Sequence, residues 1–198
     1  SARTREVGWG MTRPALIIVS GPPASGKSSL GRYIARELQL PYVSKDGIKE
    51  RLFDTLGWKD REWSKKLGEA SNELLWYLAE AELAVGRSLV VQSNLNAAWA
   101  NGKILALKAR YEFQPIQVQC MAAGEALVQR FMARERHPGH GDATLIEELA
   151  PRLLQAKPEI LEIGGAVIMV DTTDWAQVDR AGLVESVRAA MKEAENKE

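Results

Sequence analysis

The sequence predicts an α/β fold built around a mostly parallel sheet. Short apolar runs rich in β-branched residues alternate with longer segments of helical periodicity, which is the pattern of stacked strand-helix-strand units. The 198 residues suffice for one domain of this kind with a single buried core, and are few for two. Because no internal repeat or low-complexity segment interrupts this rhythm, we expect one domain.

Five apolar runs are the expected strands, at residues 15–20, 42–44, 88–93, 116–121 and 166–171. Helices are expected near residues 27–39, 46–56, 62–86, 95–111, 124–135, 144–156 and 178–195. In the third helix, apolar residues recur every three or four positions, which predicts one face packed on the rest of the protein. This stripe consists of Trp63, Leu67, Ala70, Leu74, Tyr77, Leu78 and Ala81.

Composition excludes several classes of protein. Basic and acidic residues each number 26, so no net field draws the chain to nucleic acid or to an anionic membrane. Cys120 is the only cysteine, which excludes an internal disulfide framework and favours a buried thiol in a reducing, cytoplasmic setting. No apolar run approaches the roughly 20 residues that span a bilayer. We interpret residues 1–10 as a leader and expect the domain to cover residues 11–198.

A phosphate-binding motif follows the first expected strand. Residues 21–28 read GPPASGKS, a glycine, four residues and then Gly-Lys-Ser, and a helical pattern begins at once. Gly21 and Gly26 permit the close backbone approach that lets amides surround phosphate oxygens at a helix N-terminus. Lys27 would add a positive charge at the outer phosphates, and the Ser28 hydroxyl would ligate Mg²⁺. Chance alone gives this pattern in roughly one chain in a hundred of this size, before the strand-to-helix context is required.

The motif therefore predicts a bound nucleoside triphosphate, ATP, with Mg²⁺. The residues expected to contact the nucleotide here are Gly21, Ala24, Ser25, Gly26, Lys27, Ser28 and Ser29.

From this motif onward the chain resembles the small P-loop kinases, in particular the group of polynucleotide kinases, zeta toxins and chloramphenicol phosphotransferase. The resemblance is carried, in order, by GPPASGKSSL, YVSKDGIKERL, SLVVQSN, RFMARERHPGH and VDTTD. It implies a P-loop NTPase three-layer sandwich with a five-stranded parallel sheet of order 2-3-1-4-5. It also implies a small arginine-bearing lid at about residues 130–145.

The resemblance places the acceptor side at Asp46 and Lys49. Asp46 corresponds to the carboxylate that takes the proton of the attacking hydroxyl, and it could also hold Mg²⁺ through water. Its alternative role is an N-cap of the helix at 46–56. Lys49 matches a basic substrate-holding residue of polynucleotide kinases, and it would equally suit a solvated surface.

The lid would supply arginines. Arg130 and Arg134 lie one helical turn apart, and the resemblance implies that lid arginines neutralise charge on the transferred group. We expect Arg130 and Arg134 to be catalytic, Arg130 also to bind ATP, and Arg136 to bind substrate; the alternative is a solvated surface. Thr173 would belong to the loop that meets the adenine, although a plain strand cap explains it almost as well.

The strand SLVVQSN departs from the usual P-loop pattern. An acidic residue commonly ends the strand next to the P-loop strand, and here Gln92 stands there. Either Asp46 alone serves as base and metal partner, or catalysis is weakened and the protein only binds nucleotide. Asn94 and Trp58 are further candidates for substrate contact, whereas we expect Trp63 and Tyr77 to belong to the core.

We therefore expect an ATP-dependent kinase whose acceptor is a hydroxyl of a small molecule, such as a nucleoside, a sugar derivative or a hydroxylated antibiotic. One alternative is a nucleic-acid 5′-hydroxyl kinase, which the balanced charge disfavours. The other is a non-catalytic nucleotide-binding module. Neither nucleic acid nor membrane is an expected partner, and the sequence leaves the oligomeric state open.

Overall fold

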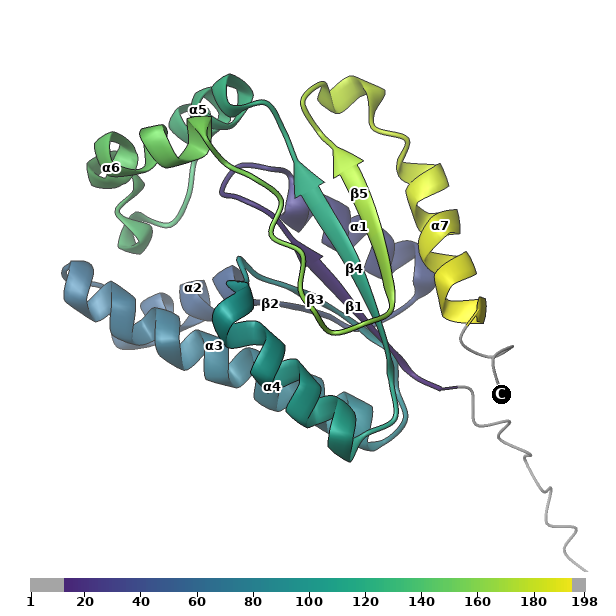
Figure 1. The fold of residues 1–198 in the computed structure, drawn as a ribbon. Helices are drawn as coiled ribbons and strands as arrows, with labels where there is room; N and C mark the ends of the chain where they lie inside the picture. The colour runs from purple at the N-terminus through teal and green to yellow at the C-terminus, as the bar shows by residue number, and fades with distance from the viewer. Residues whose placement is uncertain (1–12, 194–198) are drawn as a thin grey trace, which may run out of the picture.

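The computed structural model describes residues 13–193, with the side chains of residues 142–144 and 193 excepted, so the expected leader lies outside the described residues. The described chain forms a five-stranded parallel sheet of order β2-β3-β1-β4-β5 (Figure 1). Its strands are β1 (Ala15–Ser20), β2 (Tyr42–Ser44), β3 (Leu89–Gln92), β4 (Gln114–Met121) and β5 (Ala166–Asp171). The predicted fold class and strand order are confirmed.

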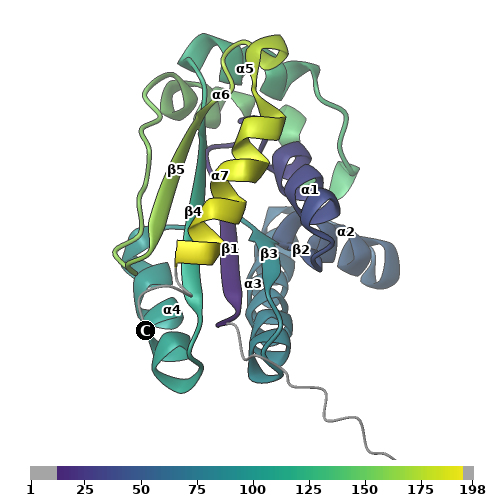
Figure 2. The ribbon, with the colours of Figure 1, turned by 90° about the vertical axis from the view of Figure 1, so that its right-hand side faces the viewer.

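Helices cover both faces of this sheet, which makes three layers (Figure 2). Helices α1 (Lys27–Leu38) and α7 (Arg180–Glu193) lie on one face, and α3 (Arg61–Ala84) and α4 (Ala97–Arg110) on the other. Beyond the carboxyl ends of the strands lie α2 (Lys45–Leu56), α5 (Gly124–Ala133) and α6 (Asp142–Leu154), with two short 3₁₀ turns at Pro138–His140 and Trp175–Gln177.

The central strand β1 explains why the sheet is buried on both faces. All six of its residues are buried, and successive side chains point to opposite sides. Leu16 and Ile18 join the apolar cluster under α3 and α4, whereas Ile17 and Val19 join the cluster under α1 and α7. β1 thereby fixes the end of the sheet from which the glycine-rich turn emerges.

The predicted buried face of α3 was wrong. The residues that α3 buries are Leu67, Ser71, Leu75, Trp76, Ala79 and Leu83. Of the predicted stripe, Leu67 is buried, while Leu74, Leu78 and the expected core residue Tyr77 are exposed, Tyr77 to 69%. The helix offers leucines on two faces, and the face that carries the large Trp76 ring fills the space over the sheet. Trp63, also expected in the core, is partly exposed and its indole donates to the Gly57 carbonyl at 2.9 Å.

The other element boundaries agree with expectation to within a few residues. β4 starts earlier than predicted, at Gln114, and α4 starts later, at Ala97, because the Asn96 side chain caps it by accepting from the Ala98 amide. Cys120 is buried within β4, as predicted. Within residues 13–193 no helix combines the length and apolar character needed to cross a membrane.

Candidate active site

The turn between β1 and α1 has the backbone of a phosphate-binding loop. Gly21 and Gly26 adopt φ of +148° and +79°, in the region that favours glycine. A Cβ on Gly21 would collide with the Cys120 carbonyl oxygen, and one on Gly26 would lie 2.5 Å from the Trp175 ring. Both glycines of the motif are therefore required by close packing, and the amides after Gly26 open α1 towards the space above the sheet.

The segment after β5 forms a hydrogen bond with this loop. The Thr172 hydroxyl lies within donating distance of two carbonyl oxygens, Ser25 O at 3.0 Å and Met121 O at 2.9 Å. Thr173 donates its amide to the Asp171 carboxylate at 2.8 Å, and its own hydroxyl accepts from the Ala123 amide. Thr173, the residue considered for an adenine loop, thus caps the end of β5, whereas Thr172 joins that end to the P-loop.

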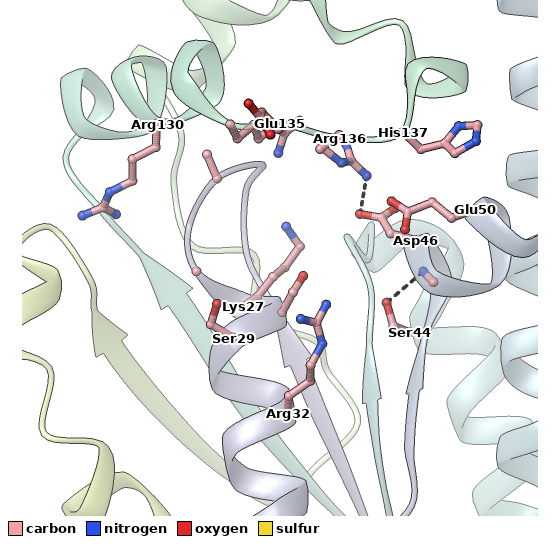
Figure 3. Close-up of a pocket in the computed structure, with 15 residues that line it drawn as sticks. Lys27, Ser29, Arg32, Ser44, Asp46, Glu50, Arg130, Glu135, Arg136 and His137 are labelled. Atoms are coloured by element: carbon pink, nitrogen blue, oxygen red, sulfur yellow. Dashed lines mark hydrogen bonds and ion pairs between the residues drawn. The ribbon is translucent and has the colours of Figure 1, made fainter.

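A cavity of about 690 Å³ opens in front of the P-loop, between α1, α2 and the segment after α5 (Figure 3). It brings together most of the predicted site. Its lining residues are Ala24, Gly26, Lys27, Ser28, Ser29, Arg32, Ser44, Asp46, Gly47, Glu50, Arg130, Arg134, Glu135, Arg136 and His137.

Lys27 is the buried cation of the cavity. Its Nζ donates to the Pro22 carbonyl within the loop at 3.1 Å. Burial lowers the pKa of Lys27 from 10.5 to about 8, and the charges of Arg134 and Arg136 act in the same direction, while Asp46 opposes them. An anionic ligand beside Lys27 would offset the cost of burying its charge. A buried cation that lacks a full counter-charge is the electrostatic property expected of a phosphate site.

Asp46 faces the P-loop from the first turn of α2. Ser44 caps this helix by accepting from the Gly47 amide at 3.2 Å, so the alternative reading of Asp46 as the N-cap is wrong. The Asp46 carboxylate forms an ion pair with Arg136 at 2.9 Å. Burial pushes the pKa of Asp46 upwards, but the positive charges of Arg136 and Lys27 outweigh it, so the pKa lies below its ordinary value and the group is ionised at neutral pH.

The three predicted arginines separate into two roles. Arg134 and Arg136 line the cavity and both contribute to the lowered pKa of Lys27. Arg130 also lines the cavity, but its guanidinium turns away from Lys27 (Figure 3) and donates to the carbonyls of Thr172 at 2.6 Å and Thr173 at 2.8 Å. Arg130 therefore holds the loop after β5, whereas the other two face the phosphate-binding side.

The segment from Arg134 to Gly141 is docked against α2. The His140 Nε2 lies 3.0 Å from a carboxylate oxygen of Glu50, and His137 lies 3.3 Å from Asp54. The His137 ring also stacks on Phe53 with centroids 5.1 Å apart. Both histidine side chains thus hold this segment against α2. Among the residues that the structure describes, no three His, Cys, Asp or Glu side chains gather as a metal site.

Three predicted substrate contacts lie away from the cavity lining. Lys49 donates to the Ser64 hydroxyl at 2.9 Å and sits 5.2 Å from the Phe53 ring centroid, so it joins α2 to α3. Trp58 is 50% exposed and meets the edge of His137. Asn94 is exposed just after β3. Their substrate roles stay predictions that this geometry does not support.

Several lining residues escaped the sequence prediction. Glu50 follows Asp46 by one helical turn, so the spacing alone could have placed both carboxylates on one face. Arg32 lies one turn beyond Ser28 on α1 in the same way. Glu135 carries no comparable signal, because it follows the end of α5 in an irregular segment.

The side chain of Gln92 forms hydrogen bonds with three hydroxyl groups next to the cavity. Its Oε1 accepts from the hydroxyls of Ser28 at 3.1 Å, Tyr42 at 3.2 Å and Ser44 at 2.9 Å. The donor set near Ser28 suits Mg²⁺, since a hydroxyl and the Asp46 carboxylate supply hard oxygen ligands from one cavity and leave room for water. The expected Mg²⁺ site therefore fits the residues present.

A family model described as an AAA domain, AAA_33, matches residues 16–150, from β1 into α6. The chain belongs to the AAA_33 family. The matched residues include the P-loop, Asp46, Gln92 and the three arginines.

Curated relatives of this AAA_33 protein are shikimate kinases. It is 34% identical over 104 residues to one from Pseudomonas syringae pv. tomato (strain ATCC BAA-871 / DC3000), a match that covers 50% of this chain and 60% of the relative. It is 33% identical over 111 residues to one from Paracidovorax citrulli (strain AAC00-1), covering 52% and 61%. The chain thus spans about three fifths of the length of the curated relatives that it matches.

Among solved structures, a candidate kinase from Chloroflexus aurantiacus J-10-fl is 38% identical with a TM-score of 0.81, covering 89% of this chain and 98% of that one. A sugar kinase from Janibacter sp. HTCC2649 has a TM-score of 0.55 at 18% identity, covering 91% and 95%, and shares the fold alone. These comparisons confirm the P-loop kinase fold. The narrower likeness to polynucleotide kinases, zeta toxins and chloramphenicol phosphotransferase stays a prediction.

Proposed function

We propose that the protein is an ATP-dependent phosphotransferase that transfers the γ-phosphate to a hydroxyl group of a small molecule. The observation that carries this proposal is the placement of Lys27 and Asp46 on opposite walls of one cavity. One wall is a phosphate-binding loop, and the other presents an ionised carboxylate to any acceptor that enters.

On the phosphate side, the amides that open α1 would hold the polyphosphate and Lys27 would leave Pro22 to contact its outer oxygens. Arg134 and Arg136 would neutralise charge that spreads over the transferred group, since both already lie close enough to influence Lys27. Arg130 would act indirectly, by fixing the loop of Thr172 and Thr173, against which the nucleotide would rest.

On the acceptor side, Asp46 would accept a hydrogen bond from the attacking hydroxyl and orient its oxygen towards the phosphorus. Its lowered pKa makes it a weak base, which is sufficient because proton transfer lags bond cleavage in a loose phosphoryl transition state. Arg136 occupies the Asp46 Oδ2, so the other carboxylate oxygen is the one offered to the acceptor. Positioning then supplies most of the rate enhancement.

Ser28 and Asp46 would hold Mg²⁺, Asp46 through water. When bound, this ion neutralises phosphate charge and draws electron density towards the leaving group. Gln92 accepts a hydrogen bond from the Ser28 hydroxyl, and this leaves the oxygen lone pairs of Ser28 available to the cavity.

The acceptor is expected to be small and rich in hydroxyl groups. The lining beyond the P-loop includes the charged side chains of Arg32, Glu50 and Glu135, which can form hydrogen bonds with hydroxyl groups. The shikimate kinase relatives favour the same class of acceptor. The engagement of Lys49 with Ser64 removes one of the two features that suggested a nucleic-acid 5′-hydroxyl kinase.

A screen of hydroxylated small molecules for acceptor-dependent release of ADP tests the proposal, with Lys27→Ala as the blank. The expected result is that at least one sugar derivative, cyclic polyol or nucleoside stimulates ADP release by the wild-type chain and not by the variant. ATP binding without stimulation by any acceptor would instead favour the non-catalytic module.

A further inference from the structure

Gln92 occupies a place where a carboxylate is common, and its surroundings give it a definite task. It ends β3, beside the P-loop strand β1, and its side chain is 1% exposed. Three hydroxyl groups from two elements converge on its Oε1, namely Ser28 on α1 and the two ends of β2, Tyr42 and Ser44, the latter also the N-cap of α2. A buried acceptor shared by three donors fixes the orientation of all of them.

The direction of each hydrogen bond follows from the chemistry of the groups. A carbonyl oxygen has no proton to give, so every hydroxyl that contacts it must donate. Ser44 then links Gln92 to α2, because its hydroxyl accepts a hydrogen bond from the Gly47 amide and donates one to Gln92. Ser28 likewise donates a hydrogen bond to Gln92, and its lone pairs remain for a metal ion.

We propose that Gln92 is the positioning residue that couples the two halves of the site. On one side it orients the Ser28 hydroxyl as a metal ligand, and on the other it holds the Ser44 cap that sets the first turn of α2 and so Asp46. An uncharged carboxamide performs both tasks because what the hydroxyls need is an acceptor oxygen. This inference rests on the proposed nucleotide site but not on the identity of the acceptor.

The first experiment measures ADP and ATP affinity by calorimetry, with and without Mg²⁺, in the wild-type chain, Gln92→Met and Gln92→Glu. Methionine keeps the approximate length but removes the acceptor, so Mg²⁺ should strengthen nucleotide binding about tenfold less than in the wild type, the effect of one lost oriented hydrogen bond. Affinity without Mg²⁺ should stay within a few-fold. Glutamate restores an acceptor oxygen and should restore the Mg²⁺ effect.

Gln117→Met is the matched control for loss of stability. Gln117 is a buried glutamine of the same sheet whose amide exchanges hydrogen bonds with the Leu161 backbone at 2.9 and 2.8 Å, outside the cavity lining. Its loss should lower the melting temperature and leave the Mg²⁺ effect intact. If Gln92→Met retains the wild-type Mg²⁺ effect, or if Gln117→Met reduces it equally, the inference is wrong.

The variant Ser44→Ala tests separately the two roles proposed for Gln92, which are to orient Ser28 and to hold the cap of α2. It removes the link from Gln92 to α2 and keeps the one to Ser28, so the Mg²⁺ effect should persist while turnover with an acceptor falls. A Ser44→Ala chain that loses the Mg²⁺ effect would contradict the assignment of that effect to Ser28. A wild-type chain that binds no nucleotide would overturn the proposed function together with this inference, whereas normal wild-type binding with an unaltered Gln92→Met overturns the inference alone.

Discussion

The guanidinium of Arg136 lies 2.9 Å from the carboxylate of Asp46, so an arginine of the segment after α5 is paired with the acid at the start of α2. The pair closes one side of the cavity over the P-loop (Figure 3). The positive charge of Arg136 helps to hold the pKa of Asp46 below its ordinary value, so the carboxylate is ionised at neutral pH.

Asp46→Asn should lower acceptor-dependent turnover about 10²-fold or more, because a neutral amide aligns the hydroxyl poorly and takes up no proton. Nucleotide affinity should change little, since the P-loop is untouched. Steady-state kinetics and calorimetry measure the two quantities. Asp54→Asn is the control. Asp54 is another carboxylate of α2, it contacts His137, and it does not itself line the cavity. Unchanged turnover in Asp46→Asn would remove Asp46 from the mechanism.

Thr172→Val should weaken nucleotide binding several-fold. The substitution removes the hydroxyl that joins the P-loop, through Ser25, to the end of β4, through Met121. The Met121 carbonyl would keep the Thr172 amide as its donor, but the Ser25 carbonyl would lose the hydroxyl, and leaving a buried acceptor unsatisfied costs about 1–3 kcal/mol in stability. Thermal unfolding and ADP titration give the two readouts. Thr55→Val is the control. The exposed Thr55 hydroxyl donates to the Arg51 carbonyl within α2, so its loss should leave nucleotide affinity unchanged. Equal effects of the two variants would contradict this role of the Thr172 hydroxyl.

Gly165→Ala should destabilise the protein more than Gly86→Ala. Both glycines have positive φ, +80° and +72°, so each substitution bears a backbone strain of about 1 kcal/mol. A Cβ at 165 would also collide with the Pro115 carbonyl, whereas the space at 86 is open. The clash should add about 1–3 kcal/mol, which urea unfolding measures. Equal unfolding free energies would show that the chain relaxes around Pro115.

The free energy of unfolding should fall as the pH drops below about 6.5, and His140 should account for part of that loss. Burial, together with the charge of Arg136, lowers the pKa of His140, although Glu50 and Asp46 oppose the shift and Lys49 adds to it. The unfolded chain therefore binds a proton that the folded chain resists, and acid favours unfolding. Urea unfolding at pH 7 and pH 5 should show a smaller difference for His140→Gln than for the wild type. An identical pH dependence would exclude His140 as the cause.

Cys120 should be inert to thiol reagents in the folded protein. Burial raises its pKa to about 12, against a small opposing effect of Lys27, and the side chain is fully buried in β4. At pH 8 an aromatic disulfide reagent should label no thiol in the native chain and one per chain in denaturant. Rapid labelling of the native chain would mean that β4 opens easily.

The strands could be predicted from the sequence because their signal is local. Runs such as that of β1 consist of consecutive apolar residues, and a parallel sheet buries both faces of such a run. The P-loop was equally predictable, since its glycines and lysine are adjacent in the sequence. The buried face of α3 was not, because leucines occur on both faces and the fit of Trp76 over the sheet decides between them.

The hydrogen bonds around Gln92 could not be predicted from the sequence for a different reason. Ser28 comes from α1 and Tyr42 and Ser44 come from β2, and only the strand order brings all three to one oxygen of β3. The sequence revealed the departure from an acidic residue, but the role of the amide depends on these tertiary contacts. The same holds for Arg136, whose partner Asp46 lies 90 positions earlier in the chain.

Gly124 brings α5 and α6 into backbone contact, since a Cβ there would lie 2.5 Å from the Leu154 Cα. The two helices also share a small apolar cluster of Leu127, Phe131 and Leu153, separate from the clusters on either face of the sheet. The segment between the two helices carries Arg134 and Arg136, which line the cavity. The packing of α5 against α6 therefore sets how far both guanidinium groups stand from the P-loop, without relying on the clusters on either face of the sheet.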